Sequence, residues 1–383
     1  MISILLSCIV NTRSLKFYTP IRHFDSLTTG ISMAEIRNRV LFSLTAEKPI
    51  PKDWVGKSFV EIIFGLIEAE DERNWITDAA TKENLSLKQV PMKATEVAAF
   101  LRQRALVKRG EVVHFVLPNC VQFHVLVFGV WLLGGVASLA DPSLSELVLQ
   151  RQLEDTKAAL VICERKSLVK IKSHFPSEKI VTIDKIFSAK PLHSAIPAAD
   201  AYFPTLRNPR NNETMVIFWS SGTTGAPKGI GHGANFLLRS LVKSSFSAST
   251  LLQTTCFFHT GGFFAPIDGG IYNGFRIVFR NANECITAES LMENVEEFKP
   301  SVIVCGSHHA AQLSTCQNFQ TYDLSSVLIV APMGSALHPS AIQDLKLRFK
   351  NMLPVTSLSI SLSDKFSSFL HQSKGCSLIL WNE

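Results

Sequence analysis

The sequence predicts an α/β protein built from mostly parallel sheets that helices cover on both faces. Short runs rich in Val and Ile recur along the chain and alternate with segments of helical spacing. This alternation is typical of parallel sheets, because each crossover helix packs on a face of the sheet. Hydrophobic residues make up 46% of the chain and charged residues 18%, which indicates a large buried core and argues against extensive disorder.

The alternation begins near Met92 and continues to about residue 330. Apolar residues that recur every three or four positions predict helices, and short apolar runs bounded by turn residues predict strands. We expect helices over 93–108, 122–133 and 144–156, and strands over 111–117, 158–163, 179–183, 215–219, 275–279, 301–305 and 326–330.

The segment 112–140 contains no Asp, Glu, Lys or Arg and approaches the length that a bilayer requires. Pro118-Asn119 interrupts it early and Gly134-Gly135 interrupts it late. These breaks favour a buried strand, a turn, an apolar helix and a second short strand over a membrane span. A protein anchored in a membrane by this segment is the alternative.

The two ends of the sequence differ from the middle in composition and periodicity. Residues 1–32 contain Arg13, Lys16 and Arg22 with no acid before Asp25, which fits either an unstructured leader or a mitochondrial transit segment. Residues 356–383 are rich in serine and have no clear periodicity, so we expect an atypical, irregular tail. The folded domain is therefore expected over residues 45–355.

Charge and cysteine usage narrow the class of protein. The formal net charge is +6, but Lys and Arg are scattered, which disfavours nucleic-acid binding and suits a small anionic substrate. The eight cysteines show no CxxC pair and no metal-ligand spacing. Several lie in apolar runs, so we interpret them as buried thiols in a reducing, intracellular compartment and predict no metal site. The sequence predicts no oligomeric state.

The segment 215–229, MVIFWSSGTTGAPKG, carries the chemistry. A buried strand leads directly into a loop whose glycines let the backbone approach a ligand closely and whose hydroxyls can donate hydrogen bonds to phosphate oxygens. A lysine after Pro227 adds a positive charge that can follow a departing pyrophosphate. This is not a Walker A loop, because Pro227 stands where that pattern requires glycine. The predicted ligand groups are Ser220, Ser221, Gly222, Thr223, Thr224, Gly225 and Lys228.

This loop resembles the signature loop of the adenylate-forming superfamily, which includes acyl-CoA synthetases, 4-coumarate–CoA ligases and beetle luciferases. Further stretches are similar in order and spacing. They are LPNC at 117–120, GGVASLADP at 134–142, QLEDTKAALVIC at 152–163, CFFHTGGF at 256–263 and YDLSSVLIVAPMGSAL at 322–337. The resemblance covers residues 45–355 and implies an incomplete large N-terminal domain of this fold.

The resemblance implies a reaction in which a small-molecule carboxylic acid attacks the α-phosphate of Mg-ATP and the resulting acyl-adenylate passes to coenzyme A. ATP, Mg2+ and coenzyme A are thus the implied cofactors, and Lys228 is the implied catalytic residue. Gly334, Ser335 and Ala336 fall where the family lines the adenine pocket. His259 falls where the family places a gate to the acyl tunnel, whereas we interpret His232 as structural because it lies two positions too early.

The sequence departs from the family after residue 357. LSISL at 358–362 stands where the family has Tyr-Gly-x-Thr-Glu, and the later ribose-binding Asp, the hinge and the small C-terminal domain with part of the coenzyme A site are not found. Two functions follow as expectations. One is an acyl-CoA ligase-type protein impaired by truncation, and the other is a non-catalytic truncated isoform that binds nucleotide, acyl ligand or a partner. Mitochondrial, cytosolic and peroxisomal locations all remain open.

Overall fold

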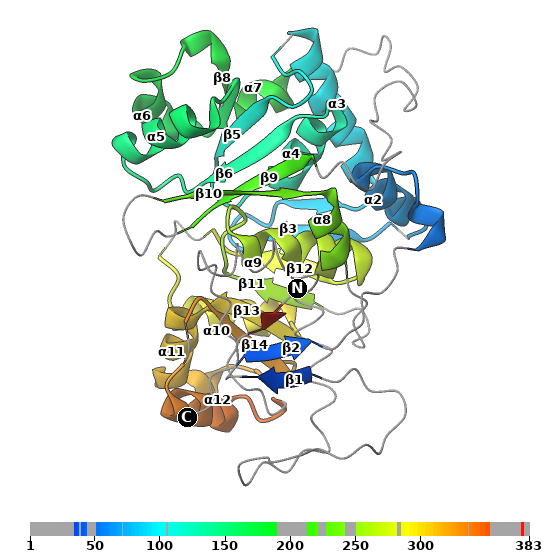
Figure 1. The fold of residues 1–383 in the computed structure, drawn as a ribbon. Coiled ribbons are helices and arrows are strands. Elements are labelled where there is room, and N and C mark those ends of the chain that lie inside the picture. Colours follow the sequence, from blue (N-terminus) through cyan, green and yellow to red (C-terminus); the bar gives the residue numbers. More distant parts are fainter. Residues whose placement is uncertain are drawn as a thin grey trace. The chain divides into compact units, whose positions relative to one another are not determined.

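The computed structural model describes residues 51–70, 72–104, 106–189, 213–220, 227–241, 250–281, 285–335 and 337–352, together with three strands at 34–37, 40–43 and 377–378. The described residues fall into two compact units (Figure 1). The first unit lies within 50–242 and 248–286, and the second contains the helices and strands from residue 287 onward and the three separate strands.

The main sheet of the first unit has the order β10-β9-β6-β5-β7-β8 in the described part of the chain (Figure 1). All its neighbouring strands are parallel except the edge pair of β10 and β9, which is antiparallel. The strands are β5 (Val112–Val116), β6 (Val136–Ala140), β7 (Leu160–Cys163), β8 (Ile180–Thr182), β9 (Thr214–Trp219) and β10 (Gly229–Gly233).

Helices cover both faces of this sheet, which is why its strands are almost entirely apolar. On one face, Leu149 and Leu153 of α5 join Val116 and Val161 of the strands in one buried cluster. On the other face, Phe123 of α4 packs against Phe115 with ring centroids 6.3 Å apart. The helices of this unit are α2 (Phe59–Glu68), α3 (Gln89–Gln103), α4 (Phe123–Leu132), α5 (Glu146–Thr156), α6 (Leu168–Lys172), α7 (Ile183–Ser188), α8 (Ala234–Ser240) and α9 (Thr260–Phe264), with short 3-10 turns η2 (Lys52–Trp54), η3 (Arg165–Ser167) and η4 (Ser177–Lys179).

Helix α4 is buried at every one of its positions, so the apolar segment 112–140 forms strand, helix and strand as predicted. It packs closely on α3, because a Cβ atom at Gly129 would lie only 2.5 Å from Val97 Cγ1. In the described residues, no helix combines the length and the apolar character that a membrane crossing requires.

A second sheet of the first unit contains β11 (Thr250–Gln253), β12 (Arg276–Phe279), β3 (Asn74–Asp78) and β4 (Asn84–Ser86), in that spatial order. β12 pairs in parallel with both β11 and β3, and β4 is antiparallel to β3. Helix α9 continues directly into a π-helix, η6 (Ala265–Tyr272), between β11 and β12.

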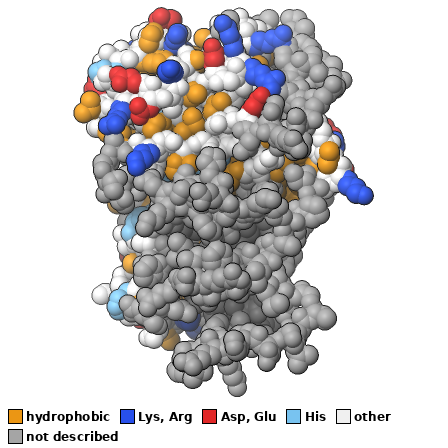
Figure 2. Space-filling model, in the orientation of Figure 1, with side chains coloured by type: hydrophobic (Ala, Val, Ile, Leu, Met, Phe, Trp, Pro, Cys, Tyr) orange, Lys and Arg blue, Asp and Glu red, His pale blue; other side chains and the backbone are white. Residues whose placement is uncertain are grey.

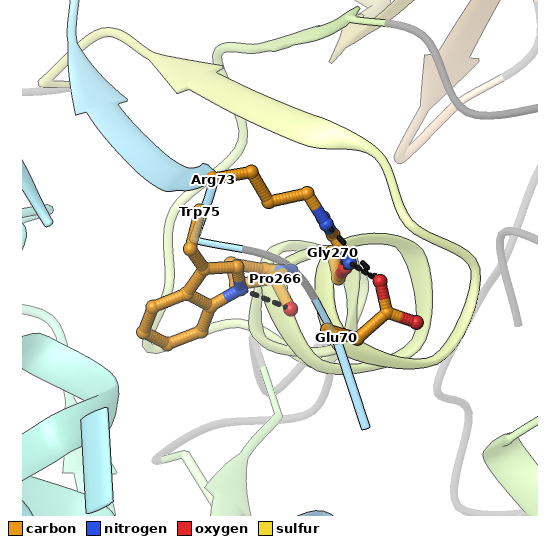
Figure 3. A network of polar contacts seen from close by, with 5 residues as sticks. All are labelled: Glu70, Arg73, Trp75, Pro266 and Gly270. Carbon is orange, nitrogen blue, oxygen red and sulfur yellow. Dashed lines mark hydrogen bonds and ion pairs between the residues drawn. The ribbon is translucent and has the colours of Figure 1, made fainter. Parts of the chain in front are cut away.

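Side chains at the start of β3 anchor the π-helix η6 by its carbonyl groups (Figure 3). Trp75 Nε1 donates to the Pro266 carbonyl at 2.7 Å, and the Arg73 guanidinium donates to the Gly270 carbonyl at 3.3 Å and pairs with Glu70 at 3.2 Å. A Cβ atom at Gly270 would lie 2.5 Å from Trp75 Nε1, so only glycine permits this approach. These contacts connect residues almost 200 positions apart in the chain.

In the second unit, β13 (Val302–Gly306) and β14 (Ile329–Met333) form a parallel pair. The helices beside them are α10 (Ala288–Phe298), α11 (Ser307–Thr315) and α12 (Pro339–Arg348), with the 3-10 turn η7 (Phe319–Thr321). A capping box formed by Thr287 and Ser290 begins α10. The strands β1 (Ala34–Arg37), β2 (Val40–Ser43) and β15 (Ser377–Leu378) pair antiparallel.

Most of the predicted strands are confirmed, with shifts at their ends. The helix expected over 93–108 is α3, which begins and ends several residues earlier. The strand expected over 326–330 begins only at Ile329, because Val327 N donates to the Leu324 carbonyl in a turn. The structure also contains β3, β4, β10 and β11, which the sequence analysis did not predict. The proposed leader, and the tail apart from β15, lie outside the described residues.

The contact between α3 and α4 leads to a test with two glycines. We expect Gly129→Ala to lower the free energy of unfolding by about 1–2 kcal/mol, because overpacking costs more than the helix propensity of alanine contributes. The control is Gly65→Ala in α2, where a Cβ atom would meet nothing within 4 Å. Here the free energy of unfolding should rise by about 0.5–1 kcal/mol. Urea unfolding curves measure both changes in the free energy of unfolding. Changes of the same sign in the two variants would contradict the packing of α3 on α4.

Candidate functional site

The glycine- and hydroxyl-rich loop lies between the antiparallel strands β9 and β10. Trp219 pairs with Gly229 at the end of the ladder. Beyond this pair, Ser220 N donates to the Lys228 carbonyl at 3.0 Å, and Lys228 N donates to Ser220 Oγ at 3.3 Å. The base of the loop is thus closed by two bonds between Ser220 and Lys228. The other predicted loop residues, Ser221, Gly222, Thr223, Thr224 and Gly225, lie outside the described residues.

The loop leaves the sheet at the edge where the parallel strands end. Leu139 of β6 pairs with Phe218 of β9, so Asp141 and Ser220 follow their strands at the same edge. In open α/β sheets, ligands bind outside the carboxyl ends of the strands. Ser220 is buried, and Lys228 lies in an exposed position at the base of the loop.

A groove of 710 Å³ runs from the base of the loop along the hairpin and the second half of α5. Its cations are Lys228 and Arg151, and Arg151 lies 3.9 Å from Asp155 in an ion pair that is more than half exposed. Such a pair is weak in water and leaves Arg151 able to contact an anion. The described lining residues are Arg151, Asp155, Thr156, Thr214, Ile217, Trp219, Pro227, Lys228, Gly229 and Gly231.

The Trp219 indole lines the groove next to the loop, and a hydrogen bond to the neighbouring strand holds it there. Trp219 Nε1 donates to Ser138 Oγ at 3.1 Å, and Ser138 Oγ is 3.0 Å from Nδ1 of the buried His114. A Cβ atom at Gly229 would lie 3.2 Å from the Trp219 ring, so the indole covers this glycine. The position of Trp219, the residue before the loop, is therefore set by β5 and β6.

His114 is held neutral by burial, which lowers its pKa from 6.5 to about 4. The neighbouring Gln152 side chain opposes this shift, but neither its carboxamide nor His114 Nε2 has a partner at hydrogen-bond distance among the described residues. Desolvation of the charged form therefore dominates the pKa of His114.

His259 lies in a tight turn between β11 and α9. His259 N donates to the Cys256 carbonyl at 3.1 Å, and Phe263 N donates to the His259 carbonyl at 2.8 Å. A Cβ atom at Gly262 would lie 2.0 Å from the Cys256 carbonyl oxygen, so this turn requires glycine. The His259 side chain is exposed, although the protein around it still lowers its pKa by desolvation, opposed by the charge of Asp141.

The predicted adenine-pocket residues lie in the second unit, after β14. Gly334 has a φ of +102°, a backbone conformation that favours glycine, and a Cβ there would meet nothing within 4 Å. Ser307, the first residue of α11, directly follows β13 and holds this segment by hydrogen bonds. Ser307 Oγ accepts from Ser335 N at 3.2 Å, and its hydroxyl lies within donating distance of the Ser335 carbonyl and of the Met333 carbonyl, the latter at 3.2 Å. Ala336 lies outside the described residues.

Burial explains the shifted pKa values of His232 and of four cysteines. His232 is buried and stacks on Phe236 with ring centroids 4.0 Å apart, and burial lowers its pKa to about 4. Burial likewise raises the pKa of the thiols to about 12 at Cys120, Cys163, Cys256 and Cys305. Their thiolates are scarce at neutral pH, which argues against a nucleophilic cysteine among these four.

The sequence analysis missed Ser138, Trp219 and Ser307, and also Asn119, whose Oδ1 accepts from Phe257 N in the turn before α9 at 2.7 Å. Each is a polar or amphipathic side chain close to the end of a parallel strand. Their bonds bridge positions between 24 and 161 residues apart, so no local pattern marks them. Pro118-Asn119, a turn pair directly after a buried strand, is the sequence feature that could have pointed to Asn119.

The surface of the described part carries mixed charge. Lys and Arg side chains are interspersed with acidic and apolar ones on the face of the first unit that Figure 2 shows. Within the described ranges, no group of three or more His, Cys, Asp or Glu side chains could hold a metal ion.

Comparisons with known proteins show what this chain is similar to. A family model described as AMP-binding enzyme matches residues 68–358. The chain is 26% identical over 283 residues to 4-coumarate-CoA ligase 1 of Narcissus pseudonarcissus, covering 70% of this chain and 51% of that protein. It is 31% identical over 196 residues to syringomycin synthase SyrB1 of Pseudomonas syringae pv. syringae, covering 50% and 29%. The chain spans about half the length of the 4-coumarate-CoA ligases of Narcissus pseudonarcissus that it matches.

Solved structures confirm the predicted fold class. The luciferase-like enzyme of the mealworm Zophobas morio matches with a TM-score of 0.68 and 20% identity, covering 86% of this chain and 79% of that one. The N-terminal domain of FACL13 from Mycobacterium tuberculosis matches with a TM-score of 0.66 and 15% identity, covering 81% and 77%. At these identities the likeness shows the fold alone.

Burial of His114 predicts a pH dependence of stability. The unfolded chain takes up this proton near pH 6.5 and the folded chain only near pH 4. The folded state therefore has its full advantage above pH 6.5 and loses it as the pH falls toward 4, by about 1.4 kcal/mol per pH unit at most. We expect His114→Gln to reduce this slope in urea unfolding measured between pH 7.5 and 4.5. Slopes that remain equal would contradict the neutral, buried state of His114.

Proposed function

Because the chain belongs to the AMP-binding enzyme family, we propose that it binds ATP at the loop between β9 and β10 and activates a carboxylic acid as an acyl-adenylate. The observation that carries this proposal is the closed base of the loop. Two hydrogen bonds between Ser220 and Lys228 hold the loop's ends together at the carboxyl edge of a parallel sheet. Fixed ends reduce the number of conformations open to a loop, which lowers the entropy that it loses when it orders around a phosphate.

The proposed reaction is a nucleotidyl transfer. An oxygen of the acid attacks the α-phosphorus of ATP, the bond from that phosphorus to the bridging oxygen of pyrophosphate breaks, and an acyl-adenylate and pyrophosphate result. Such transfers depend chiefly on positioning and on stabilising developing charge. We propose that Lys228 stabilises the negative charge on the departing pyrophosphate. We propose that Ser220 positions Lys228 by accepting a hydrogen bond from the main-chain N–H of Lys228.

We propose that the acyl group then passes to coenzyme A. The thiol attacks the acyl carbonyl carbon, and AMP leaves. This step rests on the names of the relatives, which are 4-coumarate-CoA ligases. We assign it no described residue. His259, exposed at the turn before α9, is proposed to contact the acid, and Gly334 and Ser335 are proposed to contact the adenine.

Mg2+ fits this proposal as a companion of ATP. Mg2+ is usually held by one or two carboxylates together with substrate phosphates and water, and it does not require a preformed cluster of protein ligands. The described residues, which contain no such cluster, are compatible with that mode. Bound Mg2+ would neutralise part of the triphosphate charge, and we assign it no protein ligand.

The test is ATP–pyrophosphate exchange that depends on added acid, measured with aromatic, medium-chain and long-chain carboxylic acids. We expect exchange with at least one class, and a decrease of about 100-fold in Lys228→Ala, because a group that stabilises developing charge contributes a factor of this order. Lys166→Ala, which changes another exposed lysine of the first unit, serves as the control and should retain exchange.

A binding measurement separates the enzyme from a non-catalytic nucleotide-binding protein. Mg-ATP at 100 times its dissociation constant should stabilise the folded chain by about 2.7 kcal/mol and raise its melting temperature. Stabilisation without exchange would favour the non-catalytic protein. A folded chain that shows neither would contradict the proposed function.

A further inference from the structure

One buried side chain after β5 holds the turn in which His259 lies. Asn119 follows β5 at Pro118 and is only 3% exposed. Its Nδ2 donates to the carbonyls of Thr255 at 3.0 Å and Arg280 at 3.2 Å. Its Oδ1 accepts from Phe257 N at 2.7 Å.

These three bonds determine the orientation of the carboxamide completely. Both N–H groups of the Asn119 side chain are used, each on a different carbonyl, and the oxygen is used on a main-chain N–H. A flipped carboxamide would place its NH2 against Phe257 N and its oxygen against the Thr255 and Arg280 carbonyls. All three contacts would then be repulsive in a buried site, where unpaired polar groups are costly.

Asn119 connects three strand ends that belong to two sheets of the first unit. It follows β5 of the main sheet, whereas Thr255 follows β11 and Arg280 follows β12 of the second sheet. These positions are 136 and 161 residues away in the chain. The contact with Phe257 N is made two residues before His259, at the start of the turn.

The far side of the turn has a second anchor, which shares one carbonyl with Asn119. Gln253 Nε2 donates to the Gly262 carbonyl at 2.9 Å and to the Thr255 carbonyl at 3.2 Å, and Gly262 lies against the Cys256 carbonyl. Helix α9 then runs into η6, which Trp75 of β3 and the preceding Arg73 hold in place (Figure 3). Asn119 thus supplies the anchor from the sheet that also carries the phosphate loop.

We propose that Asn119 is the positioning residue for His259 and, through it, for the carboxylic acid substrate. Asn119 fixes the turn to the end of β5, so that the His259 side chain stands at a set place relative to Ser220 and Lys228 of the same sheet. The part of this inference that concerns substrate rests on the proposed function. The part that concerns the turn rests on the three hydrogen bonds alone.

The turn is tested without activity by hydrogen exchange of the full chain, followed by mass spectrometry of peptides that cover 254–264. We expect Asn119→Ala to accelerate exchange in this segment about tenfold or more, because the buried bonds to Thr255 and Phe257 are lost. The control is Asn294→Ala in α10, which removes another buried carboxamide whose Nδ2 donates to the Ser290 carbonyl at 2.6 Å. Exchange in 254–264 that is unchanged in Asn119→Ala, or equally accelerated in Asn294→Ala, would overturn the proposal.

A second variant covers the case in which Asn119→Ala does not fold. Asn119→Ser keeps a small polar side chain and adds no buried charge, but its single hydroxyl cannot satisfy the Thr255 and Arg280 carbonyls and Phe257 N together. It should accelerate exchange in 254–264 as well, and unchanged exchange in Asn119→Ser would likewise overturn the proposal.

The positioning role is tested by a double-mutant cycle in the pyrophosphate exchange assay. Asn119→Ala should raise the KM for the acid about tenfold and change the KM for ATP less than about twofold, since it acts on the His259 turn. In a His259→Ala background, the same substitution should add less than about twofold. Additive effects would overturn the role through His259. A wild-type chain without exchange would contradict the proposed function only, and the hydrogen exchange would still decide whether Asn119 holds the turn.

Discussion

The candidate site of the first unit depends on one constraint, the common direction of the parallel strands β5, β6 and β9. The register pairs Val116 with Ala140 and Leu139 with Phe218, so the three strands end together. The segments that follow them therefore meet at one edge, although they are far apart in the sequence. Of the described strands in this sheet, only β10 runs the other way, and its reversal returns the chain so that Lys228 lies beside Ser220.

Buried polar side chains convert this shared edge into a defined geometry. Ser138 fixes Trp219 next to the loop, Asn119 fixes the turn before α9, and Ser307 does the same for the segment after β14 in the second unit. Each is buried, and its bonds go to main-chain groups or, for Ser138, to the rings of Trp219 and His114. A buried polar group is costly unless it is satisfied, so each of these side chains favours a single arrangement of its loop.

Much of this fold was predictable because its strands are short, apolar and rich in Val and Ile, as in LVIC at 160–163. The loop was predictable because its hydroxyls and glycines follow such a strand directly. β10 was not, since its sequence GIGHG has no alternating apolar pattern and forms only against β9. The π-helix η6 was equally hidden, because Trp75 and Arg73 stabilise it from almost 200 residues away. Long-range contacts of this kind leave no local trace, and the role of Asn119 was missed for the same reason.

The burial of the thiols has a practical consequence for chemical labelling. Among the described cysteines, Cys285 is exposed, whereas Cys163, Cys305 and Cys316 are buried and Cys120 and Cys256 are partly covered. Maleimides and iodoacetamides react with thiolates, and a thiol whose pKa is about 12, such as that of Cys256, offers almost none at neutral pH. Within the described residues, alkylation of the native chain should therefore be selective for Cys285. A fluorophore attached there would lie just before α10, outside the hairpin and the His259 turn, and could report on the folded protein without modifying either.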